Sequence, residues 1–219
     1  MNRRDALKNL TAGLGYTIAT PTVLSILNSC TAKTESWTPL FLSETEKHIV
    51  THLADIILPT SETPGALDVN VPQFLDLMYH DMETAVNKKL FNTGATFFVK
   101  KFNNSFNYET TLKGEKEDFE KLLNSYFTPT DGLSVEDVET LLKEDAEAII
   151  TNVDLEAPSN KVETYSIYKF LLSVKYYTLF GYFTSEKVGE EVLAYDPIPG
   201  VYNSCISVEE ATNGKAWSL

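Results

Sequence analysis

Residues 161–180 read KVETYSIYKFLLSVKYYTLF, and this stretch decides the fold. Its apolar and aromatic side chains recur so densely that a helix of this sequence is apolar nearly all round. Such a helix is stable where other helices cover it on every side. We therefore expect residues 161–180 to form the longest helix, at the centre of the domain, and Gly181 to end it.

Amphipathic segments that could cover this helix lie on its N-terminal side. Ser43 and Glu46 have the spacing of a capping box, in front of a helix that Pro59 must end. Asn70 is expected to cap a second helix, with a proline in its first turn and apolar side chains as far as Val86. Further amphipathic helices are expected at residues 90–106, 115–127 and 135–150.

No run of residues alternates between apolar and polar in the way that forms strands. The chain has 219 residues, of which 43% are hydrophobic, and this suffices for one domain with a core. The predicted fold class is therefore all-α: a single bundle-like domain of about six helices with an extended, Pro-rich C-terminal segment. The net charge of −13 disfavours nucleic acid as a partner, because phosphates attract basic surfaces.

The N-terminus has the features of an export signal. Arg3 and Arg4 precede a weakly apolar stretch that a proline interrupts, which makes it a poor membrane span. Cys30 follows as in a bacterial lipobox, where the cysteine carries the lipid; the alternative is a buried N-terminal helix with an unrelated cysteine. We expect export by the twin-arginine route and a periplasmic protein that a lipid anchors to a membrane. The expected divisions are a signal peptide at 1–29, a linker at 30–40 and a helical domain at 41–219.

The residues after the central helix change abruptly in character. Thr184 and Ser185 can cap a short helix at residues 186–193. Two prolines then fix φ and exclude helix from residues 195–202, which read YDPIPGVY. Because a rigid extended segment loses little conformational entropy on docking, we expect this one to pack on the domain, on a partner protein or on both.

Few side chains are spaced for catalysis or for cofactor binding. His48, His52 and Asp55 share one helical face, where two histidines four residues apart could chelate a metal; the alternative is a solvated polar face. The tyrosines of the central helix could stack on a ligand, although aromatic residues at helical spacing usually form core. No glycine-rich nucleotide motif and no nucleophile elbow occurs. We therefore expect no catalytic residue, no cofactor and no metal, and instead a binding or assembly role.

Four short motifs, taken in order, resemble one protein family. They are ADIILPT at 54–60, TPGA at 63–66, GYFTSE at 181–186 and YDPIPGVY at 195–202. With the export signal, they resemble the gluconate 2-dehydrogenase subunit 3 family, the small subunits of membrane-associated FAD-dependent sugar and alcohol dehydrogenases. The resemblance implies a non-catalytic subunit. Flavin and chemistry would lie in a large partner subunit of the glucose–methanol–choline (GMC) type, with a cytochrome c subunit as a further partner.

The resemblance also implies a task, which is to export the folded, FAD-loaded large subunit and to tether it through Cys30. The residues expected to dock on the partner are Tyr182, Phe183, Tyr195, Pro197, Pro199, Tyr202 and Cys205. Cys205 is the only cysteine besides Cys30, so a lipidated chain forms no internal disulfide, and Cys205 is expected to be buried or paired with another chain. The alternative function is an autonomous membrane-anchored lipoprotein that binds a sugar or another small ligand.

Overall fold

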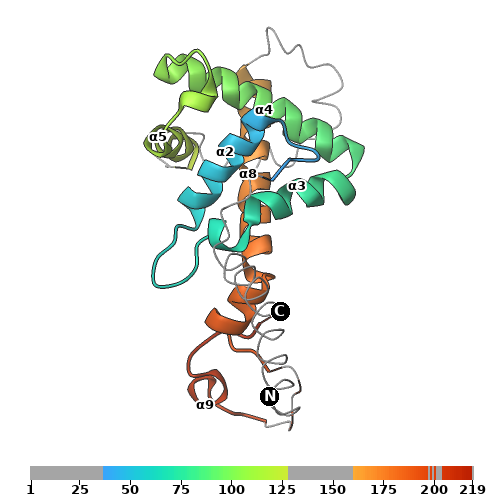
Figure 1. Cartoon of the computed structure of the whole chain (residues 1–219), viewed down its shortest axis with the longest axis vertical. Helices are drawn as coiled ribbons and strands as arrows, with labels where there is room; N and C mark the ends of the chain where they lie inside the picture. The colour runs from blue at the N-terminus through green and yellow to red at the C-terminus, as the bar shows by residue number, and fades with distance from the viewer. Residues whose placement is uncertain (1–36, 128–159, 197, 199, 201–203, 219) are drawn as a thin grey trace, which may run out of the picture. The chain divides into compact units, whose positions relative to one another are not determined.

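The structure is a computed structural model that describes residues 37–127, 160–196, 198, 200 and 204–218. Residues 39–219 form one compact unit. Its described α-helices (Figure 1) are α2 (Glu44–Ile57), α3 (Val71–Asp81), α4 (Ala85–Phe106), α5 (Lys116–Phe127), α8 (Asn160–Phe183) and α9 (Val208–Thr212). Shorter helical turns are η1 (Leu67–Val69), η2 (Thr111–Lys113) and η3 (Val188–Val192). Within the described ranges the only strand-like pairing is an isolated bridge between Ala194 and Trp217, so the all-α prediction is confirmed.

Helix α8, orange in Figure 1, lies at the centre of the bundle and packs against α2, α3 and α4. Tyr165, Phe170 and Val174 are each at most 1% exposed, although they lie at different positions around the helix. Burial of apolar surface is the dominant favourable contribution to folding, so α8 supplies a common core to the helices around it. The prediction of a central helix at 161–180 is confirmed.

Gly181 does not end α8, contrary to the expectation from the sequence. The helix continues to Phe183. Gly181 lies inside it, where the absence of a side chain allows close packing against α3. A Cβ atom at Gly181 would lie 2.5 Å from the ring of Phe74 on α3. Gly94 has the same role on α4, where a Cβ atom would lie 2.2 Å from the carbonyl oxygen of Ser166. Both glycines allow a neighbouring helix to approach α8 closely.

The expected helix starts are partly confirmed. The capping box is present, since Ser43 N–H donates to Glu46 Oε2 at 2.7 Å and Glu46 N–H donates to Ser43 Oγ at 3.2 Å. Asn70 precedes α3 as expected, but it has φ of 56° and its side chain forms no capping hydrogen bond. Helix α3 ends at Asp81, not near Val86, because a new cap at Thr84 starts α4. The helix expected at 135–150 lies outside the described residues.

Aromatic rings connect the helices through the core. Phe91 and Phe98 on α4 contact Phe170 on α8, with ring centroids 4.9 and 5.5 Å apart. Further along the same face of α4, Phe102 stacks on Phe119 of α5 at 4.4 Å. Aromatic pairs of this kind add to stability beyond the apolar area that they bury. The rings therefore hold α4 against both α5 and α8.

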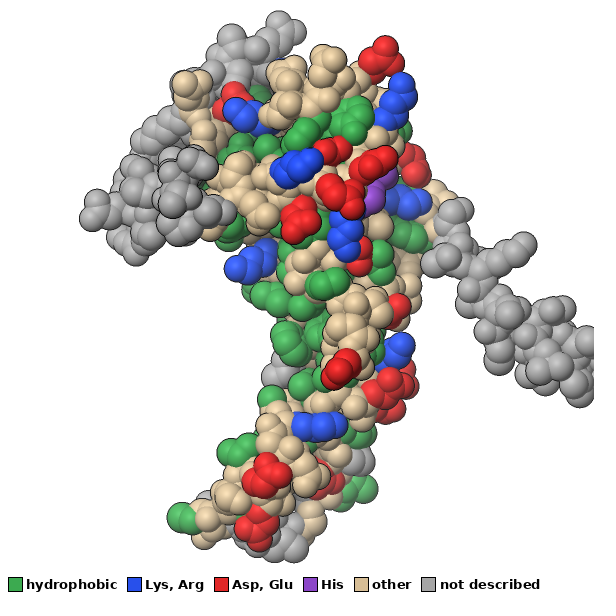
Figure 2. Space-filling model, turned by 90° about the vertical axis from the view of Figure 1, so that its left-hand side faces the viewer, with side chains coloured by type: hydrophobic (Ala, Val, Ile, Leu, Met, Phe, Trp, Pro, Cys, Tyr) green, Lys and Arg blue, Asp and Glu red, His purple; other side chains and the backbone are tan. Residues whose placement is uncertain are grey.

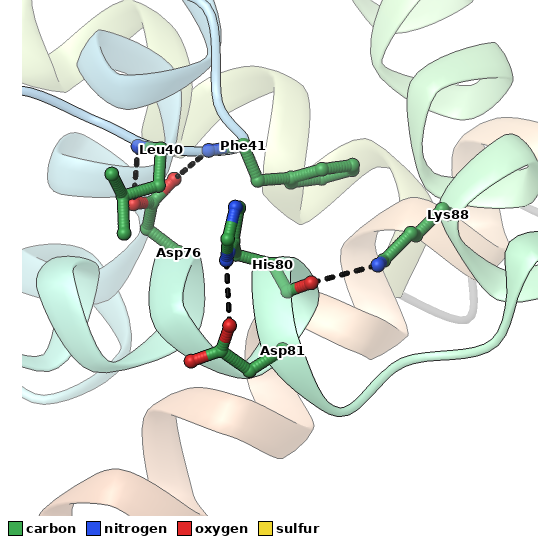
Figure 3. A network of polar contacts seen from close by, with 6 residues as sticks. All are labelled: Leu40, Phe41, Asp76, His80, Asp81 and Lys88. Carbon is green, nitrogen blue, oxygen red and sulfur yellow. Dashed lines mark hydrogen bonds and ion pairs between the residues drawn. The ribbon is translucent and has the colours of Figure 1, made fainter.

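A buried carboxylate fixes the point where the chain enters the domain (Figure 3). Asp76 on α3 is 2% exposed and accepts three backbone hydrogen bonds. Leu40 N–H donates to Oδ2 at 2.8 Å, and the N–H groups of Phe41 and Leu42 donate to Oδ1 at 2.9 and 2.8 Å. Phe41 then stacks on Tyr79 with 5.2 Å between ring centroids. The segment before α2 is thus pinned to α3.

Candidate functional site

The histidine face of α2 packs on α5 and is half-buried, so it is not a fully solvated polar face. The rings of His48 and His52 lie 4.5 Å apart, and His52 stacks on Phe119 at 4.9 Å. Asp55 forms an ion pair with Lys116, whose Nζ lies 2.5 Å from Asp55 Oδ2. Burial, followed by the nearby His48, lowers the pKa of His52. Across the described residues no group of His, Cys, Asp or Glu side chains is arranged to hold a metal ion, and this face joins two helices.

The tyrosines of α8 are divided between the core and the rim of a small cavity. Tyr165 and Tyr177 are buried, whereas Tyr176 is 61% exposed. The cavity has a volume of about 230 Å³ and lies between α8 and the corner that joins α3 to α4. Its lining includes Tyr79, Glu83, Asn87, Lys169, Ser173 and Tyr176.

Several polar groups of this cavity form hydrogen bonds with Glu83. The Glu83 carboxylate accepts hydrogen bonds from the Tyr177 hydroxyl, from Asn87 Nδ2 at 2.6 Å and from Thr84 N–H at 3.3 Å. Burial raises the pKa of Glu83, but these hydrogen bonds outweigh it and lower the pKa. Burial also raises the pKa of Tyr177, and that of Tyr79 to about 12, so both hydroxyls remain protonated and that of Tyr177 can donate to Glu83. The network fastens the α3–α4 corner to α8, which disfavours the small-ligand interpretation of the tyrosines.

Tyr182, one of the expected docking residues, belongs to the domain's own core. It is 6% exposed, and its hydroxyl donates to the carbonyl of Pro64 at 2.9 Å. It packs in a buried cluster with Ala54 and Ala66, Val71 and Val188. The adjacent Phe183 is 40% exposed, and its ring lies edge-on to that of Tyr182 with 5.2 Å between ring centroids. The GYFTSE motif therefore anchors the end of α8 through Tyr182, and Phe183 stays accessible to solvent.

A C-terminal arm follows this anchor; we use the term for the described residues between 194 and 218. Ser185 Oγ accepts from Val188 N–H at 3.4 Å and so caps the next helical segment as expected, which ends in the π-helical turn η3. Ala194 then pairs with the end of the chain: its N–H donates to the Ala216 carbonyl and its carbonyl accepts from Ser218 N–H, both at 2.8 Å. These two bonds close the arm into a loop that contains α9.

The arm exposes large apolar side chains beside acidic ones. Its exposed apolar residues are Tyr195 at 54%, Ile198 at 81%, Ile206 at 39%, Val208 at 64% and Trp217 at 55%. Figure 2 shows hydrophobic and acidic side chains interspersed in the lower part of the view, where Figure 1 places the end of α8 and α9. The acidic residues of the arm are Asp196, Glu209 and Glu210, and Glu190 and Glu191 precede them on η3. Five large exposed apolar side chains on one short segment are more than isolated surface residues would give, and we treat the arm as a candidate interaction surface.

The docking residues named from the sequence have different positions in the structure. Phe183 and Tyr195 are accessible, and Cys205 is exposed, is not in a disulfide and has φ of 60°. Pro197, Pro199 and Tyr202 lie outside the described residues. Trp217 was missed; an isolated tryptophan in an otherwise polar tail was the signal that could have identified it.

The fold and this surface define a class of protein: a helical domain with an anchored arm whose apolar side chains lack an intramolecular cover among the described residues. The sequence model of the family described as gluconate 2-dehydrogenase subunit 3 matches residues 44–200. The chain belongs to the gluconate 2-dehydrogenase subunit 3 family. The match ends before α9, so Trp217 lies beyond it. No curated protein and no solved structure shows a significant match to the chain. No helix among the described residues combines the length and hydrophobicity that a membrane span requires.

Proposed function

We propose that this chain is the non-catalytic small subunit of a periplasmic dehydrogenase complex, and that its C-terminal arm docks on the catalytic subunit. The partner is an FAD-dependent dehydrogenase of the GMC type, with a cytochrome c subunit as a further member. The observation that carries the proposal is the contrast within the last part of the chain. The residues that precede the arm, such as Tyr182 and Val188, are buried, whereas the base of the arm exposes Tyr195 and Trp217.

This contrast favours a protein partner for energetic reasons. Covering a large apolar side chain contributes roughly 1.5–3 kcal/mol, and a few aromatic anchors dominate the energy of most interfaces. The arm presents two such aromatic side chains, with Val208 and Ile198 beside them. The buried residues before the arm and the pairing of its two ends hold these side chains in place. Docking therefore costs little conformational entropy. Support for a non-catalytic role comes from the cavity beside Glu83, whose carboxylate is occupied by hydrogen bonds from Tyr177 and Asn87.

Export and tethering complete the proposal. Arg3 and Arg4 begin a twin-arginine signal, and Cys30 carries the lipid that anchors the mature complex to a membrane. A flavoprotein must fold around its cofactor before it leaves the cytoplasm. A small subunit that binds the folded flavoprotein and carries the export signal would bring the two subunits together through a route that accepts folded proteins.

Co-purification tests the proposal. The full chain is co-expressed with a GMC-type flavoprotein of the same organism, and the complex is isolated from membranes through a tag on the large subunit. We expect the wild-type chain to co-purify and a double substitution, Tyr195→Ala with Trp217→Ala, to release it while the helical circular dichroism stays unchanged. Leu112→Ala, at a 48% exposed apolar residue on η2, is the matched control and should have no effect. A wild-type chain that always purifies without flavoprotein would refute the proposal.

A further inference from the structure

The base of the arm, where its two ends pair, contains a pocket that the proposed docking does not by itself explain. It has a volume of about 400 Å³ and lies between the segment after η3 and the end of the chain, which the Ala194–Trp217 bridge holds together. The side chains that matter for its chemistry are Tyr195, Asp196, Thr212, Lys215 and Trp217. The pocket therefore combines two large aromatic rings with a carboxylate.

We propose that this pocket binds an arginine side chain of the catalytic subunit; the inference rests on the proposed function and specifies its contact. Tyr195 and Trp217 are both more than half exposed, so their rings are accessible to a side chain in the pocket. A guanidinium stacks on aromatic faces, and tryptophan gives the strongest cation–π attraction. The same group can donate two parallel hydrogen bonds to a carboxylate such as Asp196.

The Asp196 carboxylate is held in place and keeps acceptor capacity. Its Oδ1 accepts the N–H of Ile198 at 3.2 Å, and no other described residue donates to it. A carboxylate offers about four lone-pair positions, so further donors can be accommodated. This local bond orders the carboxylate beside the aromatic rings before a ligand arrives.

The charge around the pocket favours a cation. Residues 186–218 contain six acidic and two basic side chains, which gives a net charge of −4. Lys215 lines the pocket, but its Nζ lies 3.5 Å from the carbonyl oxygen of Glu191 at the end of η3, where a helix terminus attracts positive charge. Arginine fits better than lysine because its guanidinium is less strongly hydrated and is planar like the rings.

The chain cannot fill this pocket from its described part. Arg3 and Arg4 are its only arginines, and both lie in the proposed signal peptide. The pocket is continuous with the exposed apolar surface of the arm, which selects the docked subunit as the source of the arginine. The chain's own signal is the competing source, and the experiment separates the two.

Trp217 fluorescence tests the pocket directly. Trp37→Phe makes Trp217 the only tryptophan, and the full chain is titrated with N-acetylarginine methylamide. We expect a saturating change in emission, no saturation with the uncharged citrulline analogue, and roughly tenfold weaker binding after Asp196→Asn. Lys215→Gln is the control; it removes a like charge and should leave the affinity equal or higher. Equal responses to the arginine and citrulline analogues, or none to either, overturn the proposal.

Two further measurements identify the source of the arginine. A chain that lacks residues 1–29 should bind the arginine analogue with unchanged affinity; clearly tighter binding would show that Arg3 or Arg4 occupies the pocket and would overturn the assignment to the catalytic subunit. Asp196→Asn should also weaken co-purification of the flavoprotein. If it does not, while the double substitution at Tyr195 and Trp217 still does, the arginine pocket is wrong and the proposed function stands.

Discussion

The hydrogen bonds to Asp76 predict a graded loss of stability in two variants. In Asp76→Asn the amide oxygen can still accept from Phe41 and Leu42, but its NH₂ group faces the N–H of Leu40. Leu40 is 62% exposed, so water can replace that bond, and we expect a loss of about 2 kcal/mol. Asp76→Ala also leaves Leu42, 4% exposed, without an acceptor for its N–H, which raises the expected loss to about 4 kcal/mol.

Urea unfolding of the full chain, followed by circular dichroism, measures these losses. For a domain of this size about 1 kcal/mol corresponds to roughly 2–4 °C in Tm, so Asp76→Ala should melt roughly 8–16 °C below the wild type. Asp81→Asn is the matched control in the same network (Figure 3): it removes an exposed contact with His80, and we expect at most about 1 kcal/mol. If Asp76→Ala cost no more than Asp81→Asn, the carboxylate would not be what pins the entering segment.

Two further predictions concern the helix contacts. The pKa of His52 is lowered from 6.5 in the folded protein, so below pH 6.5 the unfolded chain binds more protons at this residue than the folded chain does. The folded state should therefore lose stability as pH falls from about 6.5 through the folded pKa of His52. Urea midpoints measured at several pH values should therefore fall more steeply for the wild type than for His52→Gln, and parallel curves would contradict this. Gly94→Ala should destabilise by about 2 kcal/mol or more, because the new Cβ meets a backbone carbonyl of α8 at 2.2 Å. Gly200→Ala, with no atom within 4 Å, is its control in thermal melts and should change Tm little.

The parts of the fold that depend on local chemistry could be predicted from the sequence. The density of apolar residues in α8 predicted its central position, and Ser43 with Glu46 predicted the start of α2. Predictions failed where distant packing decided the outcome. Gly181 has the local character of a helix end, yet the ring of Phe74 requires a glycine inside the helix.

The candidate site was less accessible to sequence reasoning. Tyr182 and Tyr195 lie in motifs of similar appearance, but only the fold shows that Tyr182 is covered while Tyr195 is not. His48 and His52 share a face that also carries polar neighbours, so their packing against Phe119 on a separate helix had no signal in the spacing. Trp217 joins the site only because the chain end returns to pair with Ala194.

The central position of α8 also affects the order of events during synthesis. The ribosome must proceed from residue 29 to residue 183 before α8 is complete, which at about 5–20 residues per second takes roughly 8–30 s. Helices α2, α3 and α4 pack against α8, so their core-facing sides stay uncovered during that interval. The proposed export signal with Arg3 and Arg4 is therefore synthesised long before the domain can fold. If the proposed export route admits only folded cargo, the chain would become competent for it only after α8 is complete.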